Sequence, residues 1–177
     1  MNRQALRVVL AVAAAGALAA TTVAAQGDAG RGHGPKHVSA SLTGYSEVPL
    51  ALSSPGGGFF RATIDQRQQQ IRYVLTYNGL PTTVAQAHIH FGSKSQAGGI
   101  SAFLCTNLGN GPVGTQACPA SGTIRGVLTS ADVIGPAPQG IAAGEFLELV
   151  DAIKANTAYV NVHSAEYPGG EIRGQLR

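Results

Sequence analysis

Charged residues are few in this chain and nowhere clustered. They make up 12% of its 177 residues, and the lysines and arginines stand singly along the sequence rather than in runs. Proteins that bind nucleic acids or acidic lipid surfaces carry clusters of basic residues. The sequence therefore predicts neither nucleic acid nor a membrane surface as a partner.

Recognisable catalytic motifs are also absent. The chain has no Gly-x-Ser-x-Gly elbow, no phosphate-binding glycine loop followed by a helix, and no paired carboxylates at a recognisable spacing. Ser101, Ser121 and Ser164 have no convincing base partner. Hydrolase chemistry has no support, and a binding or structural module is favoured over an enzyme.

The most apolar run of the chain, Val8–Ala20, is shorter than the roughly 20 residues that a membrane-spanning helix needs. Arg3 and Arg7 precede it, and the small residues Val23-Ala24-Ala25 follow where a signal peptidase would read them. We expect residues 1–25 to be a signal peptide and the mature protein to be secreted or periplasmic. No cysteine adjoins this cleavage site and no apolar tail ends the chain, so we expect no membrane anchor in the mature protein.

Residues 26–35 read QGDAGRGHGP, which is too rich in glycine to bury anything and predicts a flexible linker. Residues 36–177 are then enough chain for one domain. Its two cysteines are Cys105 and Cys118. In an exported chain such a pair is expected to form a disulfide, whereas two free metal-binding thiols, the alternative, would not stay reduced.

Short segments with period-two alternation or β-branched residues fill this domain, and Gly, Pro and Asn residues separate them. Helical spacing of apolar residues appears at about Glu145–Ala155. This pattern predicts an all-β fold, an eight-stranded Greek-key sandwich or barrel with one short helix. The predicted strands are His37–Leu42, Phe59–Ile64, Ile71–Tyr77, Val84–Phe91, Ile100–Cys105, Thr123–Leu128, Ala158–His163 and Glu171–Leu176.

Three histidines are the candidates for chemistry. On a strand, His88 and His90 share one face, and His163 likewise lies on the face away from the valines beside it. If the two strands are neighbours, three imidazoles meet, a ligand set that suits copper or zinc. Glu171 and Arg173 point outward from the last strand, where the carboxylate could orient an imidazole. The alternative is that these histidines are simply polar residues on a solvated face.

Several blocks of the sequence resemble the CHRD domain, first described in chordin. They are Ser41-Leu42-Thr43-Gly44, Glu47-Val48-Pro49, Ala87–Gly92, Ala158–Ser164 and Pro168–Leu176. The resemblance implies a secreted, β-rich domain that often stands alone in bacteria. It brings no established activity, so the ligand, a protein or a small molecule, is left open.

A more distant resemblance is to copper/zinc superoxide dismutase, in the order of a Gly-Leu turn, His-x-His before Phe-Gly, a cysteine, and a late Val-His. It implies a dismutase-like fold with His88, His90 and His163 as copper ligands. No histidine lies between His90 and His163, so the bridging and zinc-site histidines of that family are missing. What the resemblance leaves is a mononuclear copper site, in principle redox-active, with Arg173 as a guide for an anion.

Overall fold

Eight strands and one α-helix make up residues 36–177, the part of the chain that the computed structural model describes. The expected signal peptide and linker lie outside these residues. Every predicted strand and the predicted helix is confirmed to within two residues at each end. No helix within residues 36–177 is long and apolar enough to cross a bilayer. The elements are β1 (Lys36–Thr43), β2 (Gly57–Asp65), β3 (Gln70–Asn78), β4 (Val84–Phe91), β5 (Gly99–Thr106), β6 (Gly122–Leu128), α1 (Phe146–Lys154), β7 (Ala158–Ser164) and β8 (Ile172–Gln175).

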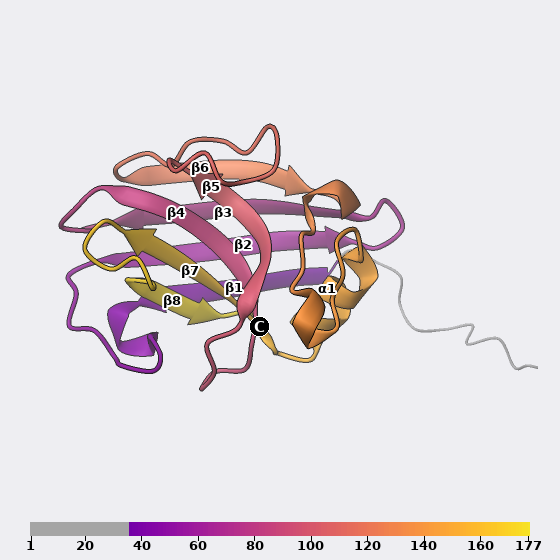
Figure 1. Cartoon of the computed structure of the whole chain (residues 1–177), viewed down its shortest axis with the longest axis horizontal. Helices are drawn as coiled ribbons and strands as arrows, with labels where there is room; N and C mark the ends of the chain where they lie inside the picture. Colours follow the sequence, from indigo (N-terminus) through magenta and orange to yellow (C-terminus); the bar gives the residue numbers. More distant parts are fainter. Residues whose placement is uncertain (1–35) are drawn as a thin grey trace, which may run out of the picture. The chain divides into compact units, whose positions relative to one another are not determined.

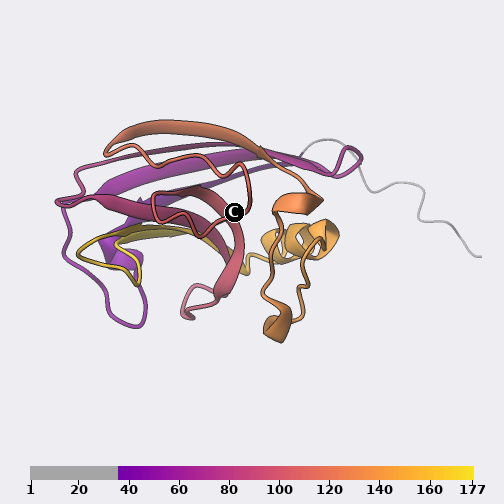
Figure 2. The same cartoon turned by 45° about the horizontal axis from the view of Figure 1, so that its top comes forward.

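The strands form one antiparallel sheet in the order β5-β4-β7-β8-β1-β2-β3-β6. Hairpins join β1 to β2, β2 to β3, and β4 to β5, whereas β4 pairs with β7 and β3 with β6 across long connections. These crossovers are the Greek-key element of the predicted fold. The sheet curls so strongly that β5 and β6, its two ends, lie near each other (Figures 1 and 2).

A side chain from the connection between β5 and β6 joins these two ends. Gln116 donates from Nε2 to the carbonyl of Leu104 in β5 at 3.2 Å and to that of Arg125 in β6 at 3.1 Å. The hydroxyl of Tyr73 in β3 also donates to Leu104 at 2.8 Å. These bonds occupy polar groups that an open sheet edge would expose. The result is a nearly closed barrel, as the strand pattern predicts.

Alternation along each strand decides which side chains fill the barrel. In β1, for example, Val38, Ala40 and Leu42 are buried while the residues between them are exposed. The helix α1 lies at one end of the barrel (Figures 1 and 2) and buries the apolar residues that its spacing predicts. Asn156, just beyond it, adopts the left-handed conformation (φ 57°) typical of a residue that ends a helix.

The two cysteines form the predicted disulfide, Cys105–Cys118, which ties the end of β5 to the loop that closes the barrel. Cys118 also donates from its backbone N–H to the side chain of Asn107. The bond spans 13 residues of sequence and leaves no free cysteine among residues 36–177.

Reduction of this disulfide should destabilise the protein by about 3 kcal/mol, because a closed loop of this length lowers the entropy of the unfolded chain. Urea unfolding with and without dithiothreitol measures the loss. A Cys105→Ser/Cys118→Ser variant is the control: its unfolding free energy should equal that of the reduced wild type and should not change when dithiothreitol is added. Equal stability of reduced and oxidised wild type would contradict the prediction.

Candidate metal centre

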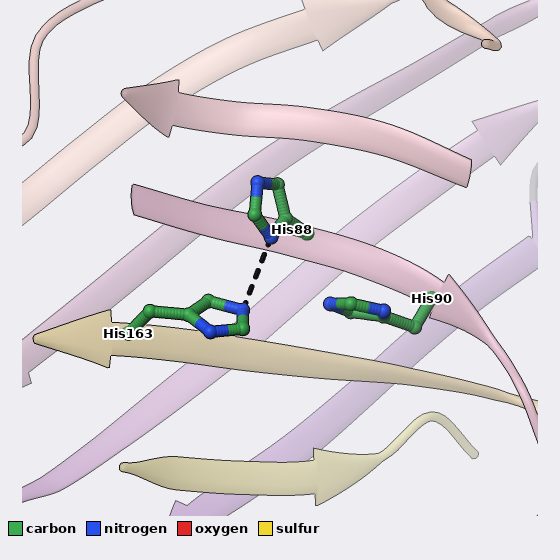
Figure 3. A group of neighbouring side chains, drawn as sticks. All are labelled: His88, His90 and His163. Carbon is green, nitrogen blue, oxygen red and sulfur yellow. Dashed lines mark hydrogen bonds between the residues drawn. The ribbon is translucent and has the colours of Figure 1, made fainter. Parts of the chain in front are cut away.

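The three histidines come from the neighbouring strands β4 and β7. On β4, Ala87 and Ile89 enter the barrel core, so His88 and His90 lie on the opposite face. The register sets His163 of β7 opposite Gln86, which makes it the diagonal neighbour of His88. Adjacency of the two strands, on which the predicted cluster depends, is therefore confirmed (Figure 3).

The imidazoles are close enough to share one ion. His88 Nδ1 and His163 Nε2 are 3.1 Å apart, and one nitrogen from each of His88, His90 and His163 lies within 4.8 Å of the others. Two nitrogens on one ion, each about 2.0–2.1 Å from it, are about 3.4 Å apart at a tetrahedral angle. Closing a gap of 4.8 Å to that distance requires a combined shift of about 1.4 Å, which rotations of the side chains can supply.

Backbone carbonyls orient two of the rings. His90 donates from Nδ1 to the carbonyl of Gly98, and His163 donates from Nδ1 to that of Pro168, both at 3.0 Å. Because a carbonyl can only accept, each of these Nδ1 atoms carries the proton and each Nε2 keeps its lone pair. His90 Nε2 is buried without any hydrogen-bond partner among the described residues. Such carbonyl–imidazole pairs are how metal-binding histidines are commonly held.

All three histidines are buried, with exposed fractions of 0% for His88, 6% for His90 and 5% for His163. The ring of Phe103 packs edge-on against that of His88, with 4.4 Å between the ring centres, and the ring of Tyr159 stacks on that of His90, with 4.8 Å between the centres. The expectation of a face away from the core is confirmed, but the alternative of a solvated face is wrong. Side chains and loops on the outside of the barrel cover the histidines.

Burial also fixes their protonation. It lowers the pKa of His90 from 6.5 to about 4 and that of His88 further, to about 2, and it lowers the pKa of His163. For His88, the nearby His163 and His90 add to the effect. All three rings are therefore neutral at pH 7, the form in which imidazole binds metals.

Comparison with known families identifies one family that matches the chain. A family model, the CHRD domain, matches residues 38–176. The chain belongs to the CHRD family. No curated protein and no solved structure matches it significantly. The CHRD resemblance of the sequence is thus confirmed over nearly the whole domain, whereas the resemblance to copper/zinc superoxide dismutase gains no support.

In this CHRD domain, Arg173 is part of the wall beside the histidines. Its guanidinium lies 3.4 Å from the centre of the Tyr159 ring and donates to the carbonyls of Ser93 and Gln96 at 2.8 and 2.9 Å. It therefore holds both the ring that stacks on His90 and the loop that follows β4.

Glu171, expected to orient an imidazole, has a different partner. Its carboxylate is fully buried and accepts a hydrogen bond of 2.5 Å from the hydroxyl of Ser54, while its second oxygen has no described partner. The carbonyl of Pro168 takes the orienting position at His163.

The sequence does not predict several residues that build this site. Gly98 is one: a side chain there would collide with the carbonyl of Phe91, so glycine alone brings the Gly98 carbonyl to His90. Glu47 is another. It is buried and accepts from Asn161 at 3.4 Å, and burial raises its pKa from 4.5 to about 7. Both lie in connections between strands, where alternation gives no signal.

The metal-free protein should lose stability as the pH falls below 6.5. Unfolded histidines bind protons near pH 6.5, whereas folded His90 stays neutral to about pH 4, so the unfolded state binds more protons in between. Each such histidine lowers the unfolding free energy by up to about 1.4 kcal/mol per pH unit. Glu47 offsets the effect of about one of the three histidines, since its raised pKa gives the folded state an extra proton between pH 7 and 4.5, which stabilises the fold as the pH falls.

Urea unfolding of EDTA-treated protein between pH 7 and 5 measures this dependence. The curve should slope downward toward acid, and a His88→Phe variant should slope less. Stability that stays constant or increases over this range would show that the histidines do not resist protonation.

Proposed function

We propose that this CHRD domain is an exported metalloprotein that binds one copper ion through His88, His90 and His163, with zinc as the alternative metal. The observation that carries the proposal is the convergence of three neutral, buried imidazole nitrogens, one of them without any described partner. A buried polar atom left unpaired costs free energy, which an ion at this position would recover. The disulfide supports export, because such bonds persist outside a reducing cytosol.

The donor set favours copper over zinc. Imidazole binds both ions, but the affinity of a given nitrogen site is higher for Cu²⁺ than for Zn²⁺. Three protein ligands leave a coordination position open, and copper bound there would supply a centre able to change oxidation state. Gly98 and Pro168 would keep two rings in the binding tautomer.

Titration of the purified protein with Cu²⁺ against a chromophoric chelator tests the proposal, followed by the same titration with Zn²⁺. We expect about one equivalent of each ion to bind, copper more tightly, and the Cu²⁺ spectrum in electron paramagnetic resonance to show nitrogen couplings. His37→Ala is the matched control, because His37 is exposed on β1 and its ring is hydrogen-bonded, among residues 36–177, only to Thr63. Nitrogen couplings that vanish in His37→Ala would place the ion elsewhere.

Redox activity is a narrower proposal that rests on the same site. The open position and the neighbouring Arg173 support a small anionic substrate such as superoxide, and assays of superoxide removal before and after copper loading test it. If the protein binds no metal, the function that its family supports is that of an extracytoplasmic binding or structural module. In that case the 3.1 Å hydrogen bond between His88 and His163 has a structural role alone.

A further inference from the structure

A row of arginines crosses the outer face of the barrel. The backbones of Arg177 and Ser39 exchange hydrogen bonds of 2.8 and 3.1 Å, and Ser39 pairs with Arg61 of β2. Arg61 pairs with Val74 of β3, and Val74 pairs with Arg125 of β6. Directly paired residues point to the same face of a sheet. The three arginines are all exposed and therefore share one surface.

Two hollows of about 370 and 560 Å³ lie along the part of this row from Arg177 to Arg61, and Arg125 lies beyond them, next to Val74 in the lining of the larger. They share the lining residues Ser39, Phe59 and Arg177, so together they form one groove. Lys94 and Arg173 line the smaller hollow, and Arg61 and Arg72 line the larger. Neither lining includes an aspartate or a glutamate.

The exposed cations of this groove form no salt bridge among the described residues; buried Arg173 alone has an acidic neighbour, Glu47. The one described salt bridge joins Lys154 to Asp151 on α1, and Arg72 donates to a neutral amide, that of Gln70. A groove lined by several cations and no carboxylate attracts anions, and an arginine fork can bind a carboxylate or a sulfate through two hydrogen bonds. The groove is thus complementary to an anionic ligand.

The spacing of the row indicates the kind of anion. Neighbouring strands lie about 4.8 Å apart, so arginines two strands apart are separated by about 10 Å. That distance is too long for one small anion and close to the length of two sugar rings. In duplex DNA, each strand carries one phosphate for every 3.4 Å or so of helix axis, which is a denser row of charges, and proteins that bind single strands stack several bases on aromatic rings. Phe59 is the one aromatic side chain exposed in either lining.

We propose that this groove binds an acidic polysaccharide, with its carboxylate or sulfate groups on Arg177 and Arg61 in the groove and on Arg125 just beyond its end, and sugar hydroxyls on serines such as Ser39. The arginines are far apart in the sequence, so a search for runs of basic residues misses them; the sheet register brings them together. No histidine of the cluster lines the groove, although buried Arg173 lies between the two, and the proposed ligand does not require the metal.

Retention of the protein on heparin and polygalacturonate columns at low salt tests the proposal, with neutral dextran as the reference. We expect binding to one or both acidic polymers, release by salt, and affinity reduced about tenfold or more in Arg61→Gln/Arg125→Gln. The control Arg67→Gln/Lys154→Gln removes the same charge outside the groove and should bind like the wild type. All four substituted residues are exposed, and circular dichroism checks that both variants are folded.

Three results would overturn the inference. The first is that the control pair weakens polysaccharide binding as much as Arg61→Gln/Arg125→Gln does, which would mean nonspecific charge attraction. The second is tighter binding to a single-stranded oligonucleotide than to either polysaccharide. The third is that the protein binds none of these polymers. A His88→Ala/His163→Ala variant should bind the polysaccharide like the wild type, so failure of the copper site and failure of the groove are distinguished.

Discussion

Copper should raise the unfolding free energy of the wild-type protein and leave that of His90→Phe unchanged. An ion that binds only the folded state stabilises it by about 2.7 kcal/mol when its free concentration is 100 times the dissociation constant. Phenylalanine keeps a ring to stack on Tyr159 but removes both nitrogens, including the Nε2 that has no described partner. The variant thus loses a ligand while retaining most of the packing.

Urea unfolding with and without buffered Cu²⁺ measures the two values. His37→Ala, altered at an exposed histidine, should gain as much from copper as the wild type does. Equal copper stabilisation of His90→Phe and the wild type would place the ion outside the cluster.

Arg173→Ala should lower the unfolding free energy by about 3 kcal/mol, even without metal. Arg173 is 2% exposed, and its loss leaves the carbonyl of Gln96 without its side-chain donor and that of Ser93 with only the backbone N–H of Gln96. It also removes the positive charge that lowers the pKa of buried Glu47. Arg173→Lys keeps the charge but not the planar fork, so we expect an intermediate loss.

Denaturant unfolding compares these variants with Arg125→Ala, which removes an exposed arginine and should change stability by less than about 0.5 kcal/mol. If Arg173→Ala unfolds at the same denaturant concentration as Arg125→Ala, Arg173 does not hold the loop after β4.

Much of this protein follows from local sequence pattern. Period-two alternation predicts the strands because each has one face in the barrel, and the same period sets His88 and His90 side by side on β4. The pattern also predicts that His163 lies on the corresponding face of its strand. The contact of β4 with β7 depends on pairing across a long connection, which no local signal encodes.

The burial of the three histidines from water could not be predicted from the strand pattern. A strand pattern distinguishes two faces but does not show whether the face away from the core meets water. Here loops bring Gly98 and Pro168 to the histidines and bury Glu47, and these approaches depend on tertiary contacts. The arginine row illustrates the same limit, because register alone joins Arg61 to Arg125.

Metal content is the most direct test of the copper site. The protein and its His88→Ala/His163→Ala variant are loaded with copper, desalted, and analysed for copper and zinc. The account predicts about one equivalent of copper in the wild type and in His37→Ala, and none in the double variant. Wild-type protein that retains no metal, or a double variant that retains as much as the wild type, would contradict it.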